Sequence, residues 1–228
     1  MKNFEDFSSG RVMLHRAGFS NYPVRLMEEV FLRCKQYLRK SEKLSVYDPC
    51  CGGAYLLTVL GYLNYDRIAK LIGSDINPDA ISLAKKNLSL LTVEGLQNRI
   101  EHLEELYSLY QKQSHREAIN SAYNLKAYIK PNELHCHTFE HDILLNPLAA
   151  QFKADIVFTD VPYDRLISWQ SGEAAEMNTL LENIKPVIHD ESIIAISSNK
   201  SQKIATSSYK KVEKLLIGKR KIEIFKVM

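Results

Sequence analysis

From residue 44 onward, short apolar segments alternate with helical patterns, and this alternation restricts the chain to an α/β fold built around a parallel sheet. The predicted strands of the parallel part cover residues 44–47, 70–74, 134–141, 154–159 and 192–197. The fourth of these is very apolar, so we expect it at the centre of the sheet, covered on both faces. Helices are expected over residues 23–38, 55–63 and 78–91.

The C-terminal residues follow a different pattern. Residues 209–217 and 221–227 alternate in polarity and flank a turn at Gly218 and Lys219, which predicts an antiparallel hairpin. A length of 228 residues suits one domain, so we expect a single domain over 1–228 whose first 43 residues form a helical segment.

An insertion of about 40 residues, 92–130, lies between the helix that follows the second strand and the third strand. A few residues normally connect such elements. Its apolar side chains recur at steps of three or four, at Leu96, Ile100, Leu103, Tyr107 and Tyr110. This spacing predicts a helical insertion with one apolar face, which we expect to dock on the body of the domain. A role in gripping a substrate is the alternative.

Charge is distributed unevenly along the chain. Residues 1–45 carry a net charge of +4, residues 46–198 carry −8 and residues 199–228 carry +7. Basic ends beside an acidic middle fit a polyanion held by the terminal segments, although a solvated lysine-rich surface is the simpler explanation. No apolar run is long enough to span a bilayer and no secretory start is present, so we expect a cytoplasmic protein without membrane or inferable protein partners.

The cysteines and histidines do not predict a metal site. Four cysteines lack any paired C-x-x-C spacing, so reduced thiols are expected. Strand alternation would put His135, His137 and His141 on one face, but no carboxylates or thiols complete a tetrahedral set around them. We therefore expect no metal and assign these histidines to the polar face of an edge strand.

Two constellations at strand ends predict a nucleoside-containing cofactor. The first strand runs into Asp48-Pro49-Cys50-Cys51-Gly52-Gly53-Ala54, a turn of small residues that opens a helix. The second strand ends at Asp75, where a carboxylate can hold the two hydroxyls of a ribose. A carboxylate such as Asp48 would repel a pyrophosphate but suits a cationic amino-acid cofactor, which favours S-adenosyl-L-methionine.

A third constellation, Asp160-Val161-Pro162-Tyr163, follows the apolar fourth strand. It combines an acceptor carboxylate, a proline that fixes the backbone and a ring that can stack on a flat base. This combination suits methylation of a nitrogen on a base, with an exocyclic amine held by Asp160 and Tyr163 on the ring face. A plain turn with a buried tyrosine is the competing interpretation.

The motif series carries a resemblance to a known family over nearly the whole chain. Its residues are Ser9–Val12, Phe19, Pro23–Leu26, Asp48–Gly52, Tyr55–Gly61, Ser74–Asp75, His141–Ile143, Thr159–Asp160, Pro162–Tyr163, Trp169 and Leu216–Gly218. On these residues the chain resembles class I S-adenosylmethionine-dependent methyltransferases, and more closely the AviRa type of ribosomal RNA methyltransferase, which is associated with avilamycin resistance. The resemblance implies a Rossmann-like sheet of seven strands with helices on both faces. It also implies methylation of a base in large-subunit ribosomal RNA, with guanine as the favoured base.

Positions carried over from the family give the expected site. Asp48 and Gly52 would flank the methionine part of the cofactor, Asp75 its ribose and Asp142 its adenine amine. The full expected cofactor set is Asp48, Cys50, Gly52, Gly53, Asp75, Ile76, Asp142 and Ile143. The residues expected at the target base are Asp160, Pro162 and Tyr163, and those expected to bind RNA are Arg11, Arg16, Trp169, Lys200, Lys203, Lys219, Arg220 and Lys221.

The chain departs from the family pattern at two places. Ala54 stands where the pattern has a glycine, which narrows the backbone approach to the cofactor, and Val161 stands where the amine-methylating motif has a proline. Three other functions therefore compete with RNA methylation: a methyltransferase acting on DNA, one acting on a protein amide, and a non-catalytic RNA-binding module. A nicotinamide dehydrogenase would want a G-x-G-x-x-G motif, which the sequence lacks.

Overall fold

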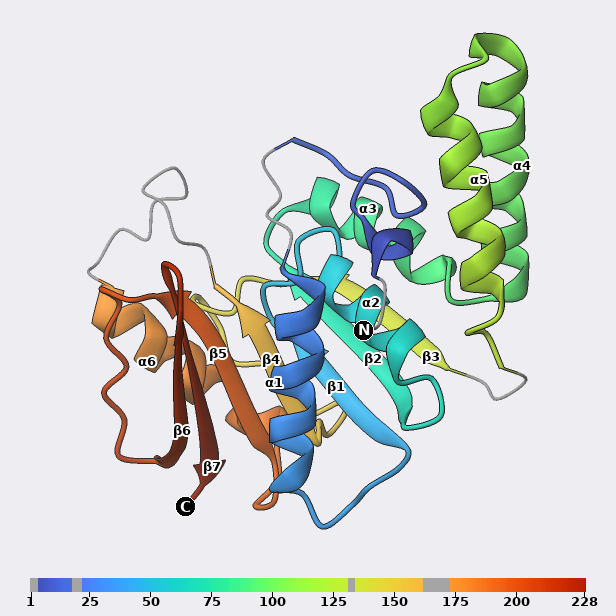
Figure 1. Cartoon of the computed structure of the whole chain (residues 1–228). Helices are drawn as coiled ribbons and strands as arrows, with labels where there is room; N and C mark the ends of the chain where they lie inside the picture. The colour runs from blue at the N-terminus through green and yellow to red at the C-terminus, as the bar shows by residue number, and fades with distance from the viewer. Residues whose placement is uncertain (1–3, 18–21, 131–133, 162–172) are drawn as a thin grey trace.

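Seven strands form one sheet in the computed structural model, which describes residues 4–17, 22–130, 134–161 and 173–228. The sheet has the order β3-β2-β1-β4-β5-β7-β6 (Figure 1). The parallel strands are β1 (Leu44–Asp48), β2 (Ile68–Asp75), β3 (His135–Glu140), β4 (Ile156–Asp160) and β5 (Ile193–Asn199). The expected α/β fold with a mostly parallel, seven-stranded sheet is confirmed.

The C-terminal hairpin extends this sheet. It consists of β6 (Tyr209–Ile217) and β7 (Arg220–Val227), and β7 also pairs antiparallel with β5. Because β7 runs opposite to β5, its first residue, Arg220, pairs with Asn199 at the carboxyl end of β5. The hairpin turn therefore lies at the edge of the sheet where the parallel strands end.

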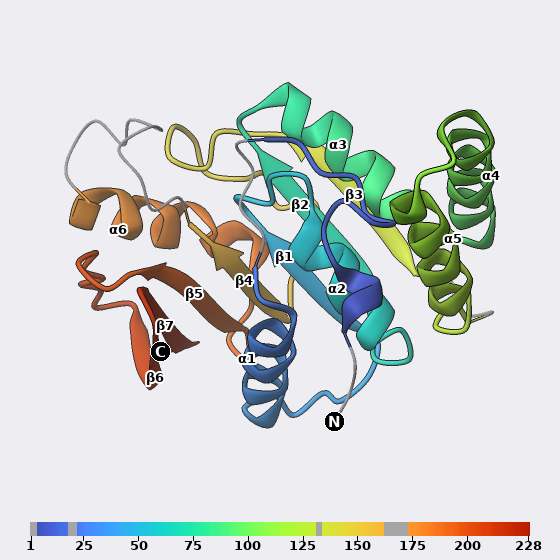
Figure 2. The same ribbon diagram turned by 45° about the horizontal axis from the view of Figure 1, so that its top comes forward.

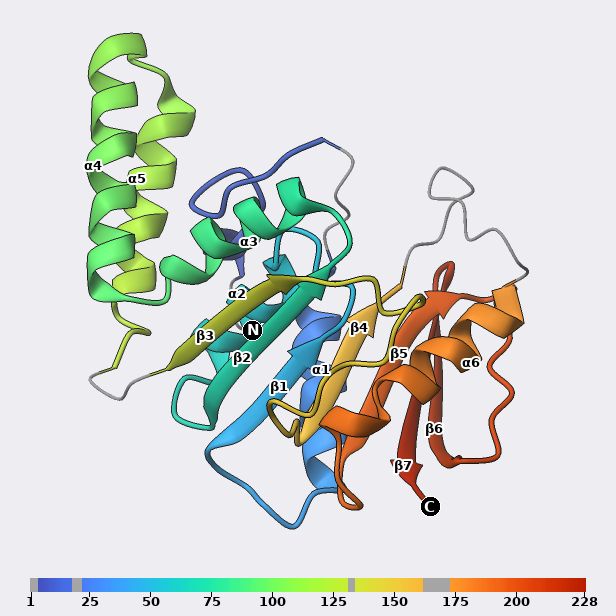
Figure 3. The ribbon, with the colours of Figure 1, turned by 180° about the vertical axis from the view of Figure 1, so that it is seen from behind.

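Helices cover both faces of the sheet. The face seen in Figure 1 carries α1 (Val24–Gln36) and α2 (Tyr55–Leu63), and α3 (Pro78–Ser89) packs beside α2. The opposite face carries α6 (Glu173–Asn183), as Figures 2 and 3 show. The described part of the chain also contains two short 3-10 helices, η1 (Glu5–Phe7) and η2 (Lys185–Val187). No helix in the described ranges is long and apolar enough to cross a lipid bilayer.

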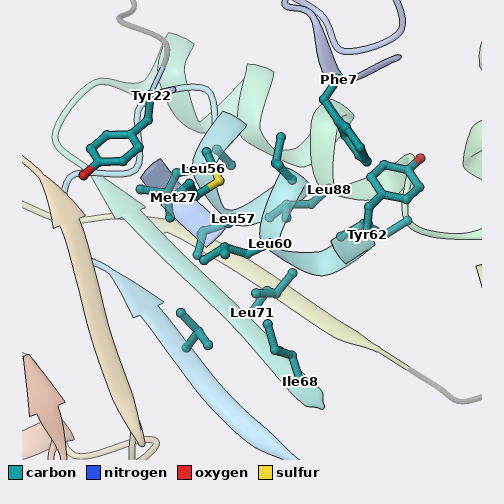
Figure 4. Packing of buried hydrophobic residues seen from close by; sticks show 14 of the residues in the cluster. Phe7, Tyr22, Met27, Leu56, Leu57, Leu60, Tyr62, Ile68, Leu71 and Leu88 are labelled. Atoms are coloured by element: carbon teal, nitrogen blue, oxygen red, sulfur yellow. The ribbon is translucent and has the colours of Figure 1, made fainter. Parts of the chain in front are cut away.

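Burial on both sides explains why the strands are so apolar. Met27 of α1, Leu57 and Leu60 of α2 and Leu71 of β2 are fully buried on one face and lie close together (Figure 4). A second cluster, which includes Val157 of β4, fills the space between the sheet and α6. With both faces covered, the carboxyl edge of the sheet is the place where polar side chains from the central strands reach solvent.

The insertion forms a pair of helices, as the helical pattern predicts for its first half. Figures 1 and 3 show α4 (Val93–Tyr110) and α5 (Gln113–Lys126) standing out from the body side by side. The predicted apolar residues Leu96, Ile100 and Leu103 are buried, together with Ala118, Ala122 and Leu125 of α5. The three residues of α4 belong to the same hydrophobic cluster as Leu60 and Leu71 of the body, and α5 adds a second partner surface that the sequence did not predict. Tyr110, near the tip, is 59% exposed.

Candidate active site

Carboxylates gather at the carboxyl edge of the sheet. Asp48, Asp75 and Asp160 are the last residues of β1, β2 and β4, and Asp142 follows β3 by two residues. Their strands are hydrogen-bonded neighbours, in the order β3-β2-β1-β4. Four acidic residues from separate parts of the sequence therefore lie at the same edge of the sheet.

Asp48 is the most deeply buried of the four. It is 2% exposed, and one of its oxygens accepts a hydrogen bond of 3.0 Å from the backbone N–H of Cys50. Burial raises the pKa of the Asp48 carboxyl to about 7, and the nearby carboxylates of Asp160 and Asp75 act in the same direction. A buried carboxylate among other carboxylates is a place where a cationic ligand gains most.

Asp75 joins the first two strand-end loops. Its Oδ2 accepts from the backbone N–H of Gly52 at 2.9 Å, and its Oδ1 accepts from the N–H of Asn77 at 2.9 Å. Gly52 has a φ of 52°, a left-handed conformation that suits glycine. Burial raises the pKa of Asp75, and the two backbone hydrogen bonds oppose that rise. Because a carboxylate has about four acceptor positions, Asp75 can still accept from ligand hydroxyls.

The start of α2 is tightly packed. Ala54 precedes the helix with a φ of 56°, so this side chain tolerates the left-handed conformation for which the family pattern uses glycine. At Gly53 a Cβ would lie 2.7 Å from Leu83, and the Gly53 carbonyl accepts from the Asn87 side chain at 2.8 Å. Contacts with Leu83 and Asn87 of α3 thus hold the loop, so its backbone conformation is defined before any ligand binds.

The loop after β3 continues the same edge. The backbone N–H of His141 donates to the Asp75 carbonyl at 3.0 Å, and Asp142 caps its own turn by accepting from the N–H of Leu144 at 2.9 Å. Ile143 is buried, and its carbonyl accepts from Asn183 of α6 at 2.7 Å. Ile76, the residue after Asp75, is by contrast 58% exposed.

Asp160 ends β4, which pairs directly with the strand that ends at Asp48, and 10% of the Asp160 side chain is exposed. The backbone N–H of Val161 donates to the Ser197 carbonyl at 3.0 Å and holds the end of β4 against β5. A guanidinium nitrogen of Arg220 lies 3.9 Å from Asp160 Oδ2. Pro162, Tyr163 and Trp169, which the sequence also predicted at the target base or on RNA, lie outside the described residues.

The thiols beside Asp48 are unsuited to nucleophilic chemistry. Burial, followed by the charge of Asp48, raises the pKa of both Cys50 and Cys51. The four cysteines are free thiols. Within the part of the chain that the structure describes, no three His, Cys, Asp or Glu side chains are grouped to hold a metal ion.

This arrangement can be compared with known proteins. The sequence profile of a family described as rRNA methyltransferase AviRa matches residues 1–220. The chain belongs to the AviRa rRNA methyltransferase family. The expected class of enzyme, an rRNA methyltransferase, is thereby confirmed.

Several known proteins are similar to most of this chain. The 23S rRNA (guanine(2535)-N(1))-methyltransferase of Streptomyces viridochromogenes is 32% identical over 222 residues, which cover 94% of this chain and 88% of that protein. Two solved structures of the rRNA methyltransferase aviRa from Streptomyces viridochromogenes have TM-scores of 0.86 and 0.87, at 32% and 31% identity, covering 97% of this chain and 91% of each of theirs. TrmN from Thermus thermophilus shares the fold, with a TM-score of 0.57 at 10% identity, covering 93% of this chain and 51% of that one.

The basic residues expected to bind RNA in this AviRa-family chain fall into separate groups. Lys200 and Lys203 are exposed just beyond β5, and the backbone N–H of Lys200 donates to the Lys219 carbonyl at 3.3 Å. These three lysines thus surround the hairpin turn at the carboxyl edge. Arg16 pairs with Asp79 at the start of α3 at 2.8 Å, and Arg11 lies 3.5 Å from Glu117 of α5.

Lys221 does not belong with these residues. Only 5% of it is exposed, its ammonium lies 2.8 Å from the buried carboxylate of Glu223, and it also donates to the Gln202 carbonyl. The expectation that Lys221 binds RNA is therefore wrong, because strand alternation turns it away from the face of its neighbour Arg220.

Tyr22 is a residue of the site that sequence reasoning missed. It is 3% exposed, its ring meets Phe158 edge-on with centroids 5.5 Å apart, and the guanidinium carbon of Arg220 lies 5.3 Å from its ring centroid. The only signal in the sequence was its place directly before Pro23, which begins one segment of the motif series.

Proposed function

We propose that this AviRa-family chain transfers a methyl group from S-adenosyl-L-methionine to N1 of a guanine in 23S rRNA, the reaction named for its relative from Streptomyces viridochromogenes. The observation that carries the proposal is the place of Asp160. It is a slightly exposed carboxylate at the end of β4, next to the buried carboxylate of Asp48 at the end of β1. A proton acceptor thus lies beside a buried carboxylate that suits a cation.

The residues of the β1 and β2 loops fit the cofactor. Asp48 offers a buried negative charge to the cationic methionine portion, and Asp75 offers acceptor positions to the ribose hydroxyls. Asp142 would accept from the adenine amine, with Ile76 and Ile143 beside it and the Cys50, Gly52 and Gly53 backbone lining the turn. Bound there, S-adenosyl-L-methionine supplies an electrophilic methyl group on a positively charged sulfur.

The name of the relative changes the expected target atom. The sequence suggested an exocyclic nitrogen, whereas N1 is a ring nitrogen that carries a proton in neutral guanine. In the proposed step N1 forms a bond to the methyl carbon, and the carbon–sulfur bond breaks with its electron pair going to sulfur. The N1 proton passes to an Asp160 oxygen, so Asp160 acts as general base.

The RNA would be held by the cations around the hairpin turn. Lys200, Lys203 and Lys219 are exposed near the site and can contact phosphates, which position the strand without selecting its sequence. A base inside a duplex cannot reach Asp160, so the target base must be unpaired or flipped out. We place this activity in the cytoplasm, where ribosomal RNA or an assembled subunit is available.

The rival functions are weaker. Methylation of DNA or of a protein amide would use the same carboxylate chemistry, but neither explains membership of an rRNA methyltransferase family. A non-catalytic module was suggested by Ala54, yet its backbone adopts the left-handed conformation that the turn needs.

Mapping the modified nucleotide tests the proposal. The protein is incubated with 23S rRNA and a tritiated methyl donor, and the labelled nucleoside is identified after digestion. We expect 1-methylguanosine at one position, which also stops reverse transcriptase because the methyl group blocks the pairing edge. Asp160→Asn should lose methyl transfer while retaining cofactor affinity in calorimetry. A labelled protein with unlabelled RNA, or methylation of another base, would overturn the proposal.

A further inference from the structure

Arg220 is brought to the active site by the antiparallel hairpin. It is the first residue of β7 and pairs with Asn199, two residues beyond Ser197, which pairs with Asp160 in the neighbouring strand. Asp160 and Arg220 thus come from distant parts of the sequence, and a guanidinium nitrogen of Arg220 lies 3.9 Å from Asp160 Oδ2.

The side chain of Arg220 is held in place on one side by an aromatic ring. Its guanidinium carbon lies 5.3 Å from the ring centroid of Tyr22, which is itself buried against Phe158. Stacking of this kind restricts a flexible side chain before any ligand arrives, so less conformational entropy is lost on binding. One quarter of the Arg220 side chain remains exposed, at 25%.

The strand ends bring a cation and a carboxylate together. Asp160 ends β4, Arg220 begins β7, and their side chains approach to 3.9 Å. A guanidinium, which only donates hydrogen bonds, thus lies beside a carboxylate, which accepts them, at the carboxyl edge of the sheet.

We propose that Arg220 selects guanine by donating a hydrogen bond to its O6 while Asp160 faces the N1–H, an inference that rests on the proposed methylation of guanine N1. O6 and N1–H are adjacent on the pairing edge of guanine, as an acceptor beside a donor. Adenine presents the reverse order, a donor amine beside an acceptor nitrogen. It would therefore place donor against donor at Arg220 and acceptor against acceptor at Asp160.

Arg220 would also support the reaction itself. When N1 loses its proton, the negative charge is shared with O6. A fixed positive charge beside O6 is therefore more favourable in the transition state than in the ground state. The cost of removing it should appear in methyl transfer rather than in cofactor binding.

The experiment pairs a change in the enzyme with a change in the base. RNA fragments carrying guanine or 6-thioguanine at the mapped position are methylated by the wild-type protein and by Arg220→Met, and kcat/KM is measured for each combination. We expect Arg220→Met to lose roughly ten- to a hundredfold on guanine, the size of one charge-assisted hydrogen bond. Because sulfur is a weaker acceptor than oxygen, the thio substitution should cost the wild-type protein clearly more than it costs the variant.

Matched variants separate this role from a structural one. Lys210 is exposed at the other end of the hairpin, so Lys210→Met should behave like the wild-type protein toward both fragments. Arg220→Lys, which keeps the charge, should recover part of the activity, and both Arg220 variants should keep the wild-type cofactor affinity. Equal thio effects in wild-type and Arg220→Met proteins would overturn this inference alone. Failure of the wild-type protein to methylate guanine N1 would overturn the proposed function and this inference with it.

Discussion

Replacing Asp48 with asparagine should stabilise the ligand-free protein above pH 7 and weaken its binding of the methyl donor. Asp48 is buried, and burial raises its pKa to about 7. Asparagine keeps the shape of the side chain and an oxygen for the Cys50 N–H, but it removes the charge. The variant therefore tests whether this carboxylate is maintained for a ligand at a cost in stability.

The size of the effect follows from the difference in proton affinity between the folded and unfolded states. In the unfolded chain the Asp48 carboxyl titrates near its ordinary pKa of 3.8. Between pH 3.8 and about 7 the folded protein holds the proton and the unfolded chain does not, so stability falls as pH rises through this window. A shift of about three units corresponds to roughly 4 kcal/mol, reached above pH 7 and absent below pH 3.8.

Urea denaturation at pH 5 and pH 8 measures this difference. The free energy of unfolding of the wild-type protein should fall by a few kcal/mol more than that of Asp48→Asn between these pH values. Asp66→Asn is the matched control, because that carboxylate is exposed beside Lys130, and it should follow the wild-type protein. Calorimetry at pH 8 should show S-adenosyl-L-methionine binding to Asp48→Asn weakened by roughly tenfold or more. Identical pH dependence in Asp48→Asn and the wild-type protein would refute the reasoning.

Three further changes test other parts of the molecule. Asp75→Ala should weaken the binding of S-adenosyl-L-methionine by roughly ten- to a hundredfold in calorimetry, because the variant loses a charge-assisted contact to the ribose and the hydrogen bond that anchors the Gly52 loop. An unchanged dissociation constant would show that Asp75 does not bind the cofactor. Lys200→Glu combined with Lys203→Glu should reduce the slope of log RNA affinity against log salt by about 0.7 to 0.9 per phosphate contact, with cofactor affinity as the control. Parallel salt lines would show that these lysines only face solvent. Gly95→Ala should lower the free energy of unfolding by about 1 to 3 kcal/mol in urea, since a Cβ there would lie 2.1 Å from the Ser89 carbonyl oxygen; an unaltered midpoint would contradict this.

Periodicity predicted most of the fold because the core strands and helices have simple patterns. The helix expected at 55–63 begins and ends at those residues, and the first strand ends at Asp48 as predicted. The second helix of the insertion was harder to predict, because the buried residues of α5 include the small side chains of Ala118 and Ala122. Alanine gives a weak apolar signal, so the partner helix could not be recognised from hydrophobic spacing.

The site was predictable where topology alone decides it. Carboxylates at the ends of parallel strands must share an edge, which is why Asp48, Asp75 and Asp160 come together. The approach of Tyr22 to Arg220 depends on how the N-terminal segment and the last hairpin meet, and no local pattern encodes that. Burial of charge at the hairpin was likewise missed, because a lysine next to a predicted turn is ordinarily exposed.

The positive charge of the C-terminal segment also affects how two copies of the protein can meet, because part of it lies on the edge strand β6. An edge strand offers unpaired backbone groups to which another chain can hydrogen-bond, and exposed lysines discourage such pairing. Lys210 and Lys214 are exposed on β6, the last strand of the sheet. Two copies meeting along this edge would bring like charges together. The lysines therefore oppose self-association along β6 in the absence of RNA, and concentrated protein should not associate through this edge.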